Sequence, residues 1–170
     1  SYELYLQDRK KGDELFEIVY EAAKEFNGAV IAPNIIRTIE GGLLSYQSDF
    51  GREHNPFTIG LDRLVDLDQD IDFIGKEALK KIKAEGISEK LVGVEIDGDP
   101  IQKVPENFWP VFDENHKKIG RLSRCFFSPR LKKNIGLAII DINFVEPGTS
   151  LVIESPKAHL NAQVHELPWF

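Results

Sequence analysis

The spacing of hydrophobic and polar positions divides this chain into two parts with different patterns. Residues 1–88 combine strand-like runs with segments of helical spacing, whereas residues 89–170 hold short apolar runs separated by turn residues. Helices that cover one face of a sheet, and short strands joined by turns, are two distinct architectures. The pattern predicts an α+β fold, in which a partial α/β layer over residues 1–88 precedes a small antiparallel β-barrel or sandwich domain over residues 89–170.

The first part is predicted to alternate strands with helices. Its expected elements are strands over residues 2–6 and 29–32 and helices over residues 13–28, 33–42 and 75–86. Asp13 is expected to cap the first helix, and Gly28 to end it at the C′ position, where a left-handed backbone favours glycine. Five aspartates lie between Asp62 and Asp72, but the central Gly and closing Glu of an EF-hand are absent. A solvated loop is therefore preferred to a calcium site.

The second part is predicted to consist of strands. Its expected strands cover residues 91–96, 110–112, 118–122, 134–142, 151–154 and 162–167. The second and third flank Asp113-Glu114-Asn115-His116, which has the composition of a hairpin turn. Short strands separated by turns are typical of a small barrel or sandwich. The change from helical spacing to short strands and turns places a domain boundary between residues 86 and 90.

Composition restricts the partners and the compartment. A formal net charge of -7 argues against a nucleic-acid or anionic-membrane surface. No apolar run approaches the roughly 18 residues of a membrane-spanning helix. The single cysteine, Cys125, excludes an intrachain disulfide framework and fits a reducing compartment. The expectation is a cytoplasmic protein without nucleic-acid or membrane partners.

Residue types that carry catalysis or bind metals are scattered. The four histidines form no metal-ligand spacing, so they are expected to be surface residues or to have no functional role, and no metal site is predicted. Cys125 lies in an apolar strand-like run, where a lone cysteine is usually a small buried hydrophobe. The chain also begins directly in a strand-like alternation and contains no methionine, which is the pattern expected of a piece that starts inside a domain.

Three separated blocks carry a resemblance to a known family. They are Ile39–Tyr46, Asp72–Leu79, and Ser128–Leu131 continued by Asn134–Ala138. In this order they resemble the C-terminal half of the glycine-cleavage T-protein (aminomethyltransferase) family, and the resemblance covers nearly the whole chain. That family uses tetrahydrofolate as a one-carbon acceptor. The resemblance therefore implies that residues 1–88 belong to a folate-binding domain and residues 89–170 to a C-terminal barrel.

Glu3 is the leading candidate for contacting folate. Its segment, Tyr2–Tyr5, is similar to a Phe-Glu-Ile-Tyr segment that supplies a folate-binding glutamate in the family, although the Gly-rich turn that precedes it there is missing here. A carboxylate accepts two parallel hydrogen bonds, as the ring N–H and amino group of a pterin edge require. Taken without the resemblance, Glu3 is the polar face of an alternating strand.

Asn34 and Tyr46 are the other two candidate folate-binding residues. Asn34 stands six positions before Glu40, where the family usually has a folate-contacting arginine, and Arg37 does not align with that position. The usual arginine contact is thus not carried over. Tyr46 offers an apolar ring with a polar hydroxyl and is expected to line a ligand pocket. Gly41-Gly42 are expected to form a helix end.

The resemblance implies two alternative reactions. Residues 37–46 and the ending Leu167-Pro168-Trp169-Phe170 are more similar to dimethylsulfoniopropionate demethylases, which implies methyl transfer from a small-molecule sulfonium to N5 of tetrahydrofolate. A true T protein instead uses an aminomethylated lipoyl carrier protein, and it releases methylene-tetrahydrofolate and ammonia. The family's catalytic aspartate lies in its N-terminal half, so no catalytic residue is assigned.

A different class of function is a binding or interaction module that performs no chemistry itself. The 170 residues alone are expected to behave in this way, because the family shares its site between both halves.

Overall fold

A computed structural model describes residues 2–169 of the chain. The chain forms two compact units, one comprising residues up to Asn34 and the other beginning at Ile35. The division predicted at residues 88 and 89 stays a prediction. Each unit is described by itself.

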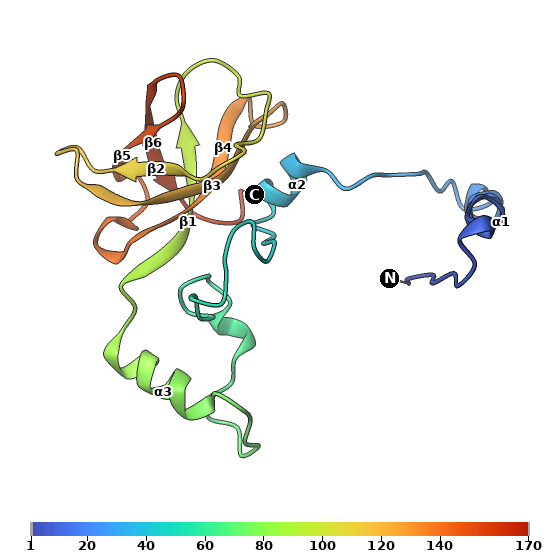
Figure 1. Cartoon of the computed structure of the whole chain (residues 1–170), viewed down its shortest axis with the longest axis horizontal. Coiled ribbons are helices and arrows are strands. Elements are labelled where there is room, and N and C mark those ends of the chain that lie inside the picture. Colours follow the sequence, from blue (N-terminus) through green and yellow to red (C-terminus); the bar gives the residue numbers. More distant parts are fainter. Residues whose placement is uncertain (1, 170) are drawn as a thin grey trace. The chain divides into compact units, whose positions relative to one another are not determined.

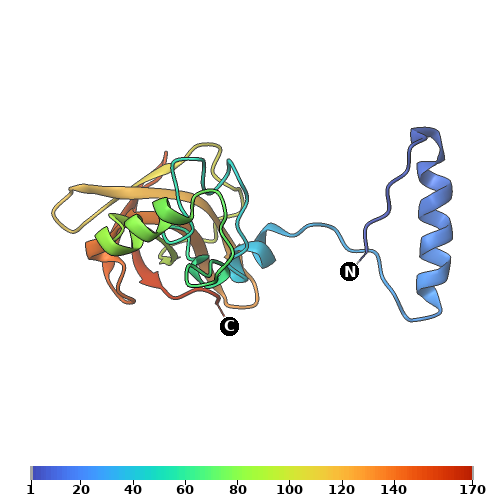
Figure 2. The same ribbon diagram turned by 90° about the horizontal axis from the view of Figure 1, so that it is seen from below.

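The regular structure of the first unit is helical. A short 3-10 turn, Arg9–Lys11, leads into α1, Gly12–Lys24 (Figure 2). The Asp8 carboxylate caps the 3-10 turn by accepting from the Lys10 N–H at 3.0 Å. Asp13, predicted as the cap of the helix, lies instead inside its first turn. A carboxylate there is still favourable, because it faces the positive end of the helix dipole.

The end of α1 differs from the prediction by one residue. Asn27, with a φ of 55°, takes the left-handed C′ position that was predicted for Gly28. The Gly28 N–H then donates to the Ala23 carbonyl at 2.8 Å, which closes a Schellman motif. The prediction was wrong because Asn also tolerates a left-handed backbone.

The predicted strands over residues 2–6 and 29–32 are absent from the described residues. Both segments lack regular structure and are exposed. A strand needs neighbours for its N–H and C=O groups, and an isolated one gains too little to persist. The described residues therefore do not show the partial α/β layer.

Three glycines terminate or start helices in the second unit as predicted. In α2, Ile35–Glu40, Gly42 has a φ of 62° and the Leu43 N–H donates to the Thr38 carbonyl at 2.8 Å. In α3, Lys76–Glu85, Gly75 and Gly86 lie at the two ends with φ of 95° and 84°. These positions favour glycine because a Cβ is strained there.

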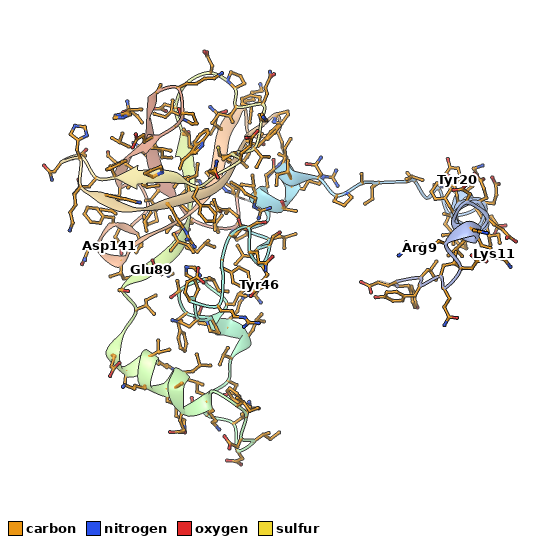
Figure 3. All side chains as sticks on the ribbon, viewed as in Figure 1. Arg9, Lys11, Tyr20, Tyr46, Glu89 and Asp141 are labelled. Atoms are coloured by element: carbon orange, nitrogen blue, oxygen red, sulfur yellow. The ribbon has the colours of Figure 1, made fainter. Side chains whose placement is uncertain are left out.

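The strands within residues 2–169 form a closed barrel (Figure 1). They are β1 Glu89–Ile96, β2 Trp109–Phe112, β3 Lys118–Ser128, β4 Lys133–Asp141, β5 Ser150–Glu154 and β6 His159–His165. Their order around the barrel is β1-β4-β3-β2-β5-β6, and every pairing is antiparallel. Glu89 pairs with Asp141 at one end of the β1–β4 ladder (Figure 3). The predicted antiparallel barrel is confirmed, and closure leaves no sheet edge to protect.

Apolar side chains pack on both sides of the barrel wall. The interior holds Val94, Leu122, Cys125 and Ile140 among others. On the outer face, Ile135 and Leu137 of β4 pack against Ile39 of α2 and Trp169 near the C-terminus. Because β4 is buried on both faces, it reads as a continuous apolar run and not as an alternation.

A bulge in β3 changes the direction of its side chains. The register between β3 and β4 shifts between Leu122 and Arg124, so Ser123 is the extra residue. Leu122 and Cys125 consequently both face the interior core, although an unbroken strand would direct them to opposite faces. Ser123 and Arg124 are both directed away from that core.

Candidate functional site

The structure places the three predicted folate-binding residues in different units. Glu3 and Asn34 belong to the first unit and Tyr46 to the second. Glu3 is exposed, and its carboxylate accepts a hydrogen bond from the Tyr5 hydroxyl. Asn34 is exposed as well. Tyr46 is half-exposed and is labelled in Figure 3. Their contacts with folate stay predictions.

Tyr46 lies in a tight turn over residues 45–50. The Asp49 N–H donates to the Ser45 carbonyl at 2.9 Å, and the Gln47 N–H donates to the Phe50 carbonyl at 2.8 Å. The rings of Tyr46 and Phe50 meet edge to face, with centroids 5.7 Å apart. The turn therefore holds the Tyr46 ring, which carries a hydroxyl, against the Phe50 ring.

A buried ion pair lies beneath this turn. Arg124 donates from Nε to Asp49 Oδ1 at 2.8 Å and from Nη2 to Oδ2 at 2.5 Å, a bidentate geometry. The side chains of Asp49 and Arg124 are 0% and 8% exposed. The Ser123 hydroxyl also donates to Oδ1, at 2.7 Å, because the β3 bulge directs Ser123 and Arg124 to the same side.

Arg124 also holds the segment that precedes the turn. Its Nη2 donates to the Leu43 carbonyl at 2.8 Å, and its Nη1 to the Thr38 hydroxyl at 3.2 Å. The guanidinium of Arg124 on β3 thus contacts three neighbouring parts of the chain: α2 through Thr38, Leu43 beyond the helix end, and the Tyr46 turn through Asp49. Such a network satisfies the buried donors and acceptors that would otherwise be costly.

The sequence did not predict this ion pair. Asp49 and Arg124 are 75 residues apart in the chain, and charged residues are usually solvated. A signal was nevertheless available, because Ser123-Arg124 is a polar pair inside an apolar strand-like run. A buried polar pair in such a run requires a partner.

Glu40 makes a second buried contact that was not predicted. Its carboxylate accepts from the Ser128 hydroxyl at 2.5 Å and from Arg130 Nε at 3.0 Å. Its backbone carbonyl accepts from the Trp169 N–H at 2.8 Å. Two of the three sequence blocks that carry the family resemblance are therefore joined directly, at the end of α2. Among the described residues, the buried Trp169 Nε1 finds no acceptor.

Asn134 of the third block holds the loop between β1 and β2 by hydrogen bonds. The buried Asn134 side chain donates to the carbonyls of Ile96 at 3.3 Å and Asp99 at 3.1 Å, and it accepts from the Ile101 N–H at 2.8 Å. This loop forms one wall of a groove of about 940 Å³, which the β5–β6 turn closes on the other side.

A smaller cavity, of about 340 Å³, lies beside the Tyr46 turn. Its lining includes Gln47, Ser48 and Arg124 together with residues 104–108 of the β1–β2 loop. None of the three predicted folate contacts lines either space.

Cys125 is buried in the barrel interior, as predicted. Desolvation raises the pKa of its thiol from 9.0 to about 12. A thiol with so high a pKa supplies little thiolate near neutral pH and is not a nucleophile.

Of the two alternatives predicted for the histidines, a surface position is wrong for His54. Its side chain is only 3% exposed, because the turn that carries it lies against β1 and β3. Nδ1 accepts from the Gly51 N–H at 3.0 Å, and Nε2 lies 3.4 Å from Arg121 Nη2 and 3.6 Å from Glu89 Oε1. Within residues 2–169, no group of three or more His, Cys, Asp or Glu side chains is arranged to hold a metal ion. Nor does any helix in this range have the length and apolar content to cross a bilayer.

The barrel is similar to proteins of known family. Residues 89–170 match the family model of the glycine cleavage T-protein C-terminal barrel domain. An aminomethyltransferase of Geobacillus sp. is 36% identical over 173 residues, which cover 100% of this chain and 46% of that protein. The dimethylsulfoniopropionate demethylase of Ruegeria pomeroyi is 27% identical over 171 residues, which cover 99% of this chain and 45% of that protein.

A solved structure has the same fold. The crystal structure of glycine cleavage system aminomethyltransferase T from Bartonella henselae superposes with a TM-score of 0.69 at 20% identity, covering 78% of this chain and 36% of that chain. The chain spans about half the length of the curated relatives it matches. Residues 89–170 thus match the glycine cleavage T-protein C-terminal barrel model, and the resemblance of the chain to the C-terminal half of the aminomethyltransferase superfamily is confirmed.

Proposed function

We propose that the protein containing this chain is a tetrahydrofolate-dependent one-carbon transferase. The observation that carries the proposal is the 36% identity to the Geobacillus aminomethyltransferase, which extends over 100% of this chain. The match therefore includes Glu3, Asn34 and Tyr46 as well as the barrel. Each of these three residues is proposed by itself as a folate contact, as the family resemblance implies, and folate and a one-carbon donor are the proposed ligands of the protein.

Aminomethyl transfer is the first candidate for the reaction. The identity of 36% to an aminomethyltransferase exceeds the 27% to the sulfonium demethylase. The partner would then be a lipoyl carrier protein. Methyl transfer from a sulfonium is the second candidate, because residues 37–46 are more similar to the demethylase form of that block and the demethylase match covers 99% of the chain.

In the sulfonium reaction, the contribution of this chain would be placement. A sulfonium is already a good leaving group, so aligning N5 of folate with the transferred carbon and excluding water are the main requirements. Such placement contributes about 7–11 kcal/mol in well-oriented systems. The half-exposed Tyr46, fixed on a hydrogen-bonded turn above a buried ion pair, suits this role.

A substrate assay tests the proposal and separates the two reactions. The product of the full reading frame is incubated with tetrahydrofolate and either dimethylsulfoniopropionate or an aminomethylated lipoyl carrier. Methylene-tetrahydrofolate and ammonia from the carrier identify an aminomethyltransferase, and methyl-tetrahydrofolate from the sulfonium identifies a demethylase. The 170 residues alone are expected to give neither product, as the module alternative requires. Turnover by these residues alone would show that the site is misplaced.

The Glu3 assignment has a separate test. Glu3→Gln presents an amide N–H₂ to the pterin donors, and losing the charge-assisted pair is expected to cost about 1.5–3 kcal/mol of tetrahydrofolate affinity. Glu17→Gln, at an exposed position of α1, is the matched control. Calorimetry with equal affinities for both variants and the unsubstituted protein would remove Glu3 from the site.

A further inference from the structure

The turn that carries Tyr46 contains a strained residue. Gln47 has a φ of 70°, in the left-handed region where a side chain with a Cβ is costly. Its N–H donates to the Phe50 carbonyl at 2.8 Å, so the unusual backbone closes the turn and brings the Phe50 ring to Tyr46. Some other contact must offset the strain for this conformation to persist.

Asp49 supplies that contact. Its Oδ2 accepts from the Ser45 N–H at 2.7 Å, while its own N–H donates to the Ser45 carbonyl at 2.9 Å. Both hydrogen bonds span Gln47, so Asp49 stabilises the closed turn. Asp49 is held in turn by the two hydrogen bonds from Arg124 and the one from Ser123.

We infer that Arg124 is a positioning residue that holds the strained Tyr46 turn in its ligand-binding geometry. Its side chain is 8% exposed, and four of its hydrogen bonds go to groups on the segment from Thr38 to Asp49. The bulge at Ser123 is what directs the guanidinium toward this segment. Arg124 would act on the ligand only through Tyr46. The consequence for folate rests on the proposed function, whereas the consequence for the turn does not.

Hydrogen exchange and ligand affinity test the inference in the full reading frame product. Arg124→Lys keeps the charge but loses the bidentate geometry, and it is expected to accelerate exchange of the Ser45 and Asp49 amides about tenfold or more. Tetrahydrofolate affinity should fall by a similar factor. Adding Gln47→Gly should restore most of both losses, because glycine adopts a positive φ without strain.

Two further variants separate positioning from general destabilisation. Arg121→Lys changes an arginine of the same strand whose ion pair with Glu53 is exposed, and it should leave both readouts unchanged. Ile153→Val removes one methylene from the interior core and lowers global stability without touching the turn, so tetrahydrofolate affinity should persist.

Three results would overturn the inference. They are unchanged exchange in Arg124→Lys, no rescue by Gln47→Gly, and unchanged affinity in Arg124→Lys when Tyr46→Ala does weaken binding. The proposed function fails in a different way, through absent tetrahydrofolate binding by the unsubstituted protein or an unchanged affinity in Tyr46→Ala. Exchange of the Ser45 and Asp49 amides decides the role of Arg124 in the turn in that case as well.

Discussion

The two units differ in what their helices bury. In the first, α1 runs for 13 residues and has a clear apolar face, yet no residue between positions 2 and 34 is buried. In the second, α2 has only six residues, but its Ile39 is fully buried against β4 and Trp169. Helix length and periodicity therefore do not decide burial. A packed partner surface does, since most helix stability in proteins comes from tertiary packing.

Charged side chains show the same contrast. Lys24 and Glu21 of α1 pair at 2.5 Å with both side chains about half exposed or more, whereas the Asp49–Arg124 pair is almost completely buried. An exposed pair is screened by water, but a buried pair becomes costly as soon as one member is lost.

The largest expected effect comes from breaking the buried pair. Asp49→Asn should lower the free energy of unfolding by about 3–5 kcal/mol, because the buried Arg124 guanidinium loses its carboxylate. Glu21→Gln breaks the exposed pair with Lys24 and should cost less than about 1 kcal/mol. Urea denaturation of both variants measures the loss of unfolding free energy. Losses of similar size would contradict the difference in burial between the two ion pairs.

A matched pair of isoleucines sharpens the comparison of helices. Ile39 of α2 is 0% exposed and Ile18 of α1 is 61% exposed. Ile39→Ala should cost about 2–5 kcal/mol of stability through lost transfer energy and a cavity. Ile18→Ala should stay within about 0.5 kcal/mol. A large loss in Ile18→Ala would show that the face of α1 is buried in the protein as it folds in solution.

Alkaline pH probes the barrel interior. Because burial raises the pKa of the Cys125 thiol from 9.0 to about 12, its contribution to stability is complete below pH 9 and is lost as the pH rises toward 12. Relative to Cys125→Ala, the unsubstituted protein should lose about 1.4 kcal/mol per pH unit in this window. Tyr5 in the first unit also has a raised pKa, because its hydroxyl donates to Glu3, but its exposure should leave no measurable slope. Parallel pH profiles of the two proteins would contradict the burial of Cys125.

The smallest expected effects are at the helix ends. Gly42 after α2 and Asn27 after α1 both have a left-handed backbone. Gly42→Ala should lower the free energy of global unfolding by about 1–2 kcal/mol through backbone strain, because α2 packs against β4 of the barrel. Asn27→Ala should lower only the helix content measured by circular dichroism. Equal effects of the two changes on global unfolding would mean that both helices belong to one cooperative unit.

The sequence alone located the strands of the barrel and the glycines at the helix ends. Both are encoded locally, since alternating apolar residues between turns specify strands, and Gly42, Gly75 and Gly86 occupy backbone conformations that favour glycine. The sequence also supplied the family, through three blocks whose order matches the T proteins. The structure shows why two of those blocks occur together, because Glu40 of one hydrogen-bonds to Ser128 and Arg130 of another.

Only the tertiary structure decided the remaining features. Residues 2–6 and 29–32 have strand-like composition but form no strand, because strand formation depends on partners that composition cannot supply. The pairing of Asp49 with Arg124 spans 75 positions and depends on a bulge at Ser123. The polar pair Ser123-Arg124 indicates that a partner is needed but not which residue supplies it. Short-range patterns therefore indicated the strands of the barrel and the ends of the helices. Long-range contacts determined which strand-like segments pair and which polar side chains are buried together, because burial is a property of the whole packed chain.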